Sequence, residues 1–185
     1  MTAAGFALFD TALGHCAIAW GAQGLTALQL PEVSERQTRE RMRRRCAGAP
    51  EATPPAEVQA VIDDVAALLV GRPADLSAVR LDMAATPDFD RRVFAVARNI
   101  APGATLTYGE VAARLGDATL ARAVGQALGR NPFAIVVPCH RVLAANGRLG
   151  GFSASGGGAT KRRLLLLECA RTSAQPGLFD TTGRD

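Results

Sequence analysis

The stretch TYGEVAARLGDATLARAVGQALG, residues 107–129, decides how the second half of the chain folds. Thr107 stands three residues before Glu110, which is the spacing of a capping box and predicts that a helix begins here. The pattern indicates a short helix over residues 108–115 and a second helix over about residues 119–129. Two short helices joined by a tight glycine-containing turn predict a helix-turn-helix, a pattern that other helical hairpins share.

Small side chains cover the second of these helices, which reads ARAVGQA over residues 121–127. A glycine inside a helix, here Gly125, costs about 1 kcal/mol relative to alanine. Its presence indicates either tight packing against another helix or the close approach of a ligand, and composition does not separate the two.

An apolar run over residues 133–137 leads directly into PCHRV at residues 138–142. Cys139 is followed by a histidine and an arginine, and a nearby base or positive charge favours the reactive thiolate form. Cys139 is therefore the candidate nucleophile. The other three cysteines are interpreted as structural or incidental: Cys16, Cys46 and Cys169.

The first half of the chain has the pattern of a small α/β unit. Short apolar runs separated by glycines over residues 6–31 predict an antiparallel meander. Helices are expected over residues 34–46 and 57–69, a further strand over 76–83, and a helix over 89–100 at the start of the second half. The arginine-rich character of the first helix is interpreted as a solvated face.

We therefore expect three parts. An α/β N-terminal domain, a small antiparallel sheet plus helices, occupies residues 1–85. A mostly helical C-terminal domain with the helix-turn-helix occupies residues 86–171, and a flexible tail follows over residues 172–185. A chain of 185 residues can bury its core without disulfides or metals.

Composition excludes several classes of protein. There is no run of about 18 apolar residues and no secretory signal, so neither a membrane span nor export is expected. Four cysteines without a CxxC pair favour free thiols in the cytoplasm and no metal site. Residues 88–171 carry 12 basic and 5 acidic side chains, and this excess of positive charge is a weak indication of phosphate binding.

The pentapeptide at residues 138–142 resembles the active-site signature of the O6-alkylguanine-DNA alkyltransferases. Further motifs of that family occur in the same order, so that the resemblance covers about residues 87–169. They are IAPG (100–103), TYGEVA (107–112), RAVG (122–125), NP (131–132), GRLGG (147–151), KRRLL (161–165) and Glu168.

This resemblance implies repair of double-stranded DNA containing O6-alkylguanine, with O4-alkylthymine as a further candidate. Family members extrude the damaged nucleotide, because O6 is not accessible inside the duplex. They place the second helix in the narrow minor groove, where Ala123 and Gly125 leave room. Arg122 matches the arginine that fills the gap left by the base, and Tyr108 matches the tyrosine that donates to guanine N3. Arg141 is also expected to contact DNA.

The same resemblance implies the chemistry of transfer. Cys139 attacks the alkyl carbon, His140 takes the thiol proton through a water, and Glu168 orients His140. The thioether product is not reversed, so each molecule acts once, and no cofactor is implied. Asn131 matches a residue that links the DNA-binding element to the cysteine.

Pocket residues are implied as well. The backbone of Cys139 and of Val142 would accept from the guanine amino group, and Ser153 would lie near O6. Phe152 stands where relatives often have tyrosine. The glycine-rich loop over residues 152–161 is about two residues longer than the commonest form, which would alter the alkyl groups that fit.

Two other functions are considered. Alkyltransferase-like proteins bind the lesion without transfer, but they lack the cysteine that this chain has at Cys139. A cysteine hydrolase would use Cys139, His140 and Glu168, but adjacent cysteine and histidine side chains diverge, and the sequence shows no oxyanion hole.

The tail contains a second short motif. Gln175, Leu178 and Phe179 form a Gln-x-x-Leu-Phe pattern that resembles the peptide by which bacterial proteins dock on the replication sliding clamp. A tail that folds back onto the domain is the alternative. We otherwise expect a monomer with no membrane association.

Overall fold

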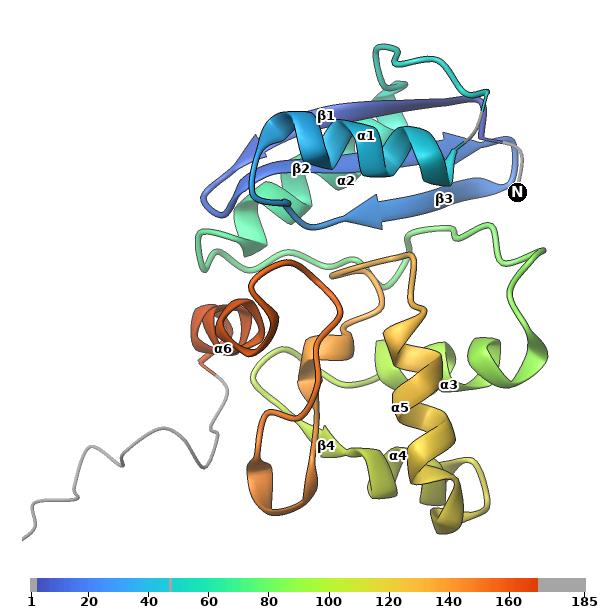
Figure 1. Cartoon of the computed structure of the whole chain (residues 1–185), viewed down its shortest axis with the longest axis vertical. Coiled ribbons are helices and arrows are strands. Elements are labelled where there is room, and N and C mark those ends of the chain that lie inside the picture. Colours follow the sequence, from blue (N-terminus) through green and yellow to red (C-terminus); the bar gives the residue numbers. More distant parts are fainter. Residues whose placement is uncertain (1–2, 47, 170–185) are drawn as a thin grey trace, which may run out of the picture.

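The first half of the chain folds into a three-stranded antiparallel sheet (Figure 1). The computed structural model describes residues 3–46 and 48–169. The strands pair in chain order: β1 (Gly5–Thr11), β2 (Gly14–Gly21) and β3 (Gly24–Gln29). Gly14 and Gly24 begin the second and third strands with φ of 119° and 126°, a backbone region that favours glycine. The predicted meander is confirmed.

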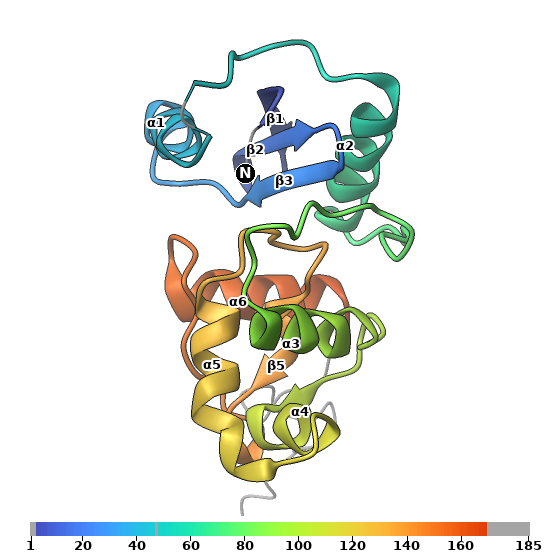
Figure 2. The ribbon, with the colours of Figure 1, turned by 90° about the vertical axis from the view of Figure 1, so that its right-hand side faces the viewer.

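Two helices cover opposite faces of this sheet, as Figure 2 shows. They are α1 (Glu35–Arg45) and α2 (Ala56–Leu68), and both lie close to their predicted bounds. Helix α1 begins where the hydroxyl of Ser34 accepts a hydrogen bond from the Gln37 backbone. Phe6, Met42 and Cys46 form a small apolar cluster between α1 and the sheet.

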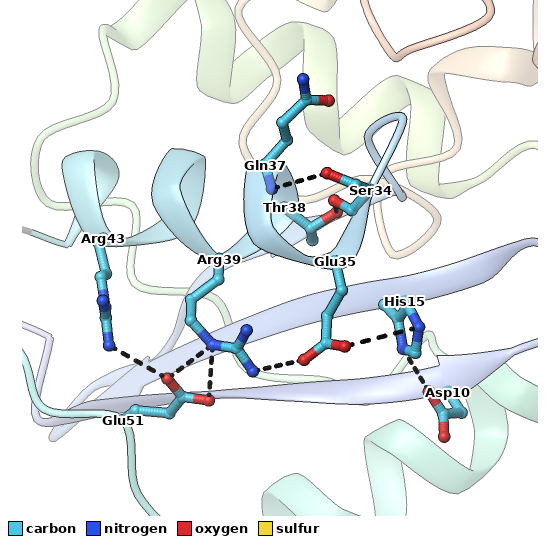
Figure 3. A network of polar contacts seen from close by, with 9 residues as sticks. All are labelled: Asp10, His15, Ser34, Glu35, Gln37, Thr38, Arg39, Arg43 and Glu51. Carbon is cyan, nitrogen blue, oxygen red and sulfur yellow. Dashed lines mark hydrogen bonds and ion pairs between the residues drawn. The ribbon is translucent and has the colours of Figure 1, made fainter.

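One side of α1 carries a ladder of ion pairs (Figure 3). Arg39 donates to Glu35 at 2.6 Å and to Glu51 at 3.0 Å, and Arg43 lies 3.6 Å from Glu51. These side chains are accessible to solvent, so water screens each pair and its contribution to stability is small. The interpretation of a solvated face suits this side of the helix, whereas Arg41 and Arg45 line a cavity described below.

The strand expected over residues 76–83 is wrong. Among the described residues of this segment, only Leu81 forms a bridge to β3. The carboxylate of Asp75 accepts from the Ser77 backbone at 2.8 Å, which turns the chain. Arg98, the last residue of α3 (Asp88–Arg98), donates to three carbonyls of the segment, so these groups have partners without a sheet.

The second half is helical, and the helix-turn-helix is present. It consists of α4 (Tyr108–Arg114), a 3₁₀ turn (Ala118–Leu120) and α5 (Ala121–Gly129), and α6 (Gly157–Leu167) ends the described chain. Thr107 Oγ1 accepts from the Glu110 backbone at 3.1 Å, and Glu110 accepts from the Thr107 backbone at 2.6 Å. The predicted capping box is confirmed.

A two-stranded parallel sheet ties the helix-turn-helix to the segment after Cys139. Its strands are β4 (Leu106–Thr107) and β5 (Val142–Leu143). No sequence pattern predicted this pairing, because each strand has only two residues. It brings the first residue of α4, Tyr108, to the side of the cysteine.

The two halves of the chain pack directly against each other and share one apolar core. Leu28 of β3 donates its backbone N–H to Pro132 at 2.8 Å and accepts from Ala134 at 3.0 Å. One apolar cluster runs from the sheet through α2 to α3, α5 and α6. Within residues 3–46 and 48–169, no helix is long and apolar enough to cross a membrane.

Candidate active site

Two very tight turns deliver Cys139 to its position. Val136 donates to the carbonyl of Ala134 at 2.9 Å across Ile135, which has φ of 72°. This is a γ-turn with positive φ, a strained conformation for a β-branched residue. Cys139 then donates to Val137 at 2.8 Å across Pro138, which has φ of −80° and ψ of 66°. The strained residue, Ile135, lies four positions before the candidate nucleophile, and strained backbone commonly occurs near functional sites.

Asn131 holds the same turns from the other side. Its carbonyl accepts from the Phe133 backbone at 2.9 Å, and its amide donates to Val137 at 2.9 Å. The Asn131 side chain also lowers the pKa of the Cys139 thiol. Because Asn131 follows directly after α5, it connects the end of this helix to the cysteine.

The Cys139 thiol is partly buried at the start of a 3₁₀ turn (Cys139–Arg141). Burial raises the pKa of Cys139, and the Asn131 side chain and the charge of Lys161 act in the opposite direction. The thiol form is therefore the resting form, and any reaction in which the sulfur acts as a nucleophile requires the loss of its proton.

His140 lies inside the protein and faces a carboxylate from α6. Its Nε2 is 2.9 Å from Oε1 of Glu168. Burial lowers the pKa of His140 and Glu168 partly restores it, so the ring is neutral at pH 7. A neutral ring that donates from Nε2 to a carboxylate carries its lone pair on Nδ1, which is the nitrogen available to accept a proton.

Arg141 shares the same carboxylate, and the expectation that it contacts DNA is corrected here. Its guanidinium donates to both oxygens of Glu168, at 2.8 and 2.7 Å, and to the carbonyl of Ile100 at 2.6 Å. Arg141 is only 7% exposed, and its guanidinium hydrogen-bonds to groups inside the protein. Burial of Glu168 would raise the pKa of its carboxyl, but hydrogen bonds from His140 and Arg141 hold it at about 2.

Lys161 is the site residue that sequence reasoning missed. It is fully buried, and its Nζ donates to the carbonyl of Val142 at 2.6 Å and lies 5.7 Å from the centre of the Tyr108 ring. Burial lowers its pKa to about 8. One signal was available, because 20 of the 21 basic residues are arginines and Lys161 is the single lysine.

Tyr108 lies between two glycines beside the cysteine. Its ring contacts Gly125 of α5 on one side and Gly150 on the other, and its hydroxyl is 3.4 Å from the carbonyl of Gly151. Burial and the charge of Cys139 raise the pKa of Tyr108, so the phenol keeps its proton and can donate. A Cβ added at Gly125 would lie 3.7 Å from the Tyr108 ring, an ordinary contact, so packing within the protein does not by itself require glycine here.

Two cavities meet at Cys139. The larger, of about 280 Å³, lies beside α5 and is called the α5 cavity. The smaller, of about 40 Å³, lies between β3, α1 and the cysteine loop and is called the α1 cavity. Both are lined by Cys139, Phe152 and Ser153. Val142 lines neither cavity, and its carbonyl already accepts from Lys161.

The exposed surface of α5 carries the other expected DNA-binding residues. Arg122 is exposed, and Ala123 and Gly125 are partly exposed on the same helix. Among residues 3–46 and 48–169, no cluster of three metal-ligating side chains occurs. The predicted clamp motif, with Gln175, Leu178 and Phe179, lies outside the described residues.

A helix-turn-helix packed against a cysteine with a buried histidine–carboxylate pair defines a DNA-binding fold joined to a nucleophilic site. The family model described as the DNA-binding domain of 6-O-methylguanine DNA methyltransferase matches residues 88–170. A methylated-DNA–protein-cysteine methyltransferase of Methanothermobacter thermautotrophicus is 36% identical over 151 residues, which are 82% of this chain and 77% of the relative. The chain belongs to the methylated-DNA–protein-cysteine methyltransferase family.

Other relatives agree with this assignment. The Mycobacterium tuberculosis enzyme of the same name is 42% identical over 127 residues, which are 68% of this chain and 74% of the relative. A crystal structure of Mycobacterium tuberculosis OGT in complex with DNA has a TM-score of 0.71 at 34% identity, covering 91% of this chain and 95% of that one. The expected family and fold class are confirmed.

Proposed function

We propose that this chain repairs DNA by direct reversal, transferring the alkyl group from O6 of a flipped guanine to Cys139 in a single turnover. The observation that carries the proposal is the position of Cys139. Its thiol lies in the wall of the α5 cavity, next to the His140–Glu168 pair and behind the helix that presents Arg122. The chain is thereby equipped to bind DNA and to alkylate its own sulfur.

The proposed step forms a bond from Sγ of Cys139 to the alkyl carbon and breaks the bond from that carbon to O6. The thiol proton passes to Nδ1 of His140 through a water, and Glu168 stabilises the resulting imidazolium. Guanine leaves with the electron pair of the broken bond. Tyr108, which keeps its proton, donates to guanine N3 and so stabilises the developing anion.

Base flipping is proposed to depend on α5. Arg122 has a side chain free to enter the stack, because no described residue pairs with it, and the small residues Ala123 and Gly125 let the helix approach the minor groove. Ser153 lines both cavities and would lie close to O6. O4-alkylthymine is a further candidate substrate for the same site.

The decisive experiment is mass spectrometry after incubation with duplex DNA that contains one O6-methylguanine. We expect one methyl mass, added once, on the peptide that contains Cys139, and no repair of a second portion of DNA. Cys139→Ser should abolish the reaction, whereas Cys169→Ser, which removes an exposed thiol, should not. Repeated turnover, as in a hydrolase, or lesion binding with an unmodified Cys139 would contradict the proposal.

The flipping role of Arg122 has its own test. Arg122→Ala should slow repair of duplex DNA far more than transfer from free O6-methylguanine, because only the duplex requires the base to be extruded. Arg43→Ala, which removes an arginine from α1, controls for the change in net charge. Equal losses on the two substrates would refute the flipping role.

We also propose that the monomer docks on the bacterial sliding clamp through the tail motif. The support is the Gln-x-x-Leu-Phe spacing of Gln175, Leu178 and Phe179. Binding of purified clamp should be lost in Leu178→Ala/Phe179→Ala. Equal or absent binding in both proteins would remove this proposal.

A further inference from the structure

The α1 cavity opens a second approach to the sulfur of Cys139. Its volume of about 40 Å³ has room for about three water molecules, which is too small for a nucleobase. The first half of the chain supplies half of its lining residues, from the end of β3, the segment that follows it and α1. A small substituent on the reacting carbon can enter this space while a purine occupies the larger α5 cavity.

Charged side chains in the wall leave this cavity electropositive. It is lined by Arg41, Arg45 and Glu32, and Arg41 forms an ion pair with Glu32. Arg45 donates to the carbonyl of Pro132 at 3.3 Å, and no carboxylate among the described residues lies within ion-pair distance of it. One positive charge therefore remains without a counter-ion.

The pKa of Arg45 agrees with this picture. Desolvation by the surrounding protein and the charge of Arg41 lower it from the ordinary arginine value. The Arg45 side chain is nevertheless exposed, so it stays charged, and its one described partner is the neutral carbonyl of Pro132. An anion in the α1 cavity would supply the missing partner.

We propose that the α1 cavity selects O6-alkyl groups that end in a small anion, of which carboxymethyl is the simplest. This inference rests on the proposed transfer to Cys139. In the step, Sγ bonds to the methylene carbon, the bond from that carbon to O6 breaks, guanine takes the electron pair, and the thiol proton passes to His140. The carboxylate itself does not react and lies toward Arg45.

The proposal requires the α1 cavity to distinguish two substituents of equal size by their charge, whereas a pocket that is merely large would accept both equally. Carboxymethyl and carbamoylmethyl groups have the same number of non-hydrogen atoms, but only the first is an anion. A hydrogen bond between charged groups is stronger than one to a neutral group. The ratio of the carboxymethyl rate to the carbamoylmethyl rate should therefore depend on the charge of the cavity wall.

The first test uses the free protein and needs no DNA. Iodoacetate and iodoacetamide place these two groups on a thiolate with loss of iodide, and the peptide that contains Cys139 reports the rate of each by mass spectrometry. Arg45→Gln should lower the iodoacetate-to-iodoacetamide ratio by about tenfold. Glu32→Gln should raise the ratio, since it removes the negative charge of the wall. Arg43→Gln, on the far side of α1, is the matched control and should leave it unchanged.

The second test uses duplexes that carry O6-methyl-, O6-carboxymethyl- or O6-carbamoylmethylguanine. The wild type should transfer carboxymethyl faster than carbamoylmethyl, and Arg45→Gln should lose this preference while methyl transfer is retained. If the ratio of anionic to neutral substituent is the same in all variants while methyl transfer is intact, the inference is overturned and the proposed function is not. A shift in the reagent ratios without methyl transfer from DNA would support the cavity's selectivity and overturn the proposed function.

Discussion

Replacing Glu168 by glutamine should destabilise the fold in a manner that depends on pH. Among the described residues, Glu168 is the one carboxylate that accepts from Arg141, through two hydrogen bonds, and it pairs with His140 through a third. Glutamine keeps the shape of the side chain but removes its charge. The variant therefore leaves a buried guanidinium without a counter-ion.

The magnitude follows from the pKa of Glu168, which the fold lowers from 4.5 to about 2. A folded-state pKa below the unfolded value means that the stabilisation is fully present above pH 4.5 and is lost as the pH falls toward 2. The shift corresponds to about 3 kcal/mol at pH 7. At pH 3 less than half of this should remain.

Urea unfolding of wild type and Glu168→Gln at pH 7 and pH 3 measures both values. Glu110→Gln is the control, because Glu110 is an exposed carboxylate whose capping bond is worth about 1 kcal/mol. A difference for Glu168→Gln that stays the same at both pH values would refute the electrostatic reasoning. So would a loss below about 1 kcal/mol at pH 7.

Three further changes test other parts of the fold by the same unfolding measurement. Burial lowers the pKa of Lys161 from 10.5 to about 8, so the unfolded chain binds the proton more tightly than the folded protein. Between pH 8 and pH 10.5 the unfolding free energy of wild type should therefore rise by about 3 kcal/mol relative to that of Lys161→Met. A difference that stays constant over this range would contradict the reasoning. Asp90→Asn should cost about 1–2 kcal/mol, since Arg130 donates to this buried carboxylate at 2.8 and 3.0 Å, and no loss would show that the pair is not stabilising. Gly158→Ala should stabilise by about 0.5–1 kcal/mol, because an added methyl meets no atom within 4 Å inside α6; a loss would indicate a contact that the structure does not contain.

Local signals predicted the elements whose cause is local. The capping box of Thr107 and Glu110 predicted where α4 begins, and glycines predicted the turns of the sheet. The residues around Cys139 predicted it as the nucleophile, because the neighbouring histidine and arginine are visible in the chain. These features need only residues a few positions apart, so a sequence displays them directly.

Long-range contacts decided the rest. Residues 76–83 have the composition of a strand, but Arg98 satisfies their carbonyls from a helix that comes later in the chain. Arg141 looked like a DNA contact because it is basic, and only the fold shows that Glu168, 27 residues away, turns it inward.

The sequence by itself therefore determined the helix-turn-helix and the meander, and it singled out Cys139 as the candidate nucleophile. Only the tertiary structure placed Lys161 beneath Tyr108 and brought Arg45 of α1 to a cavity that Cys139 also lines. The physical reason is that burial and electrostatic potential depend on every segment that packs around a group. Neither quantity can be read from the few residues that flank it.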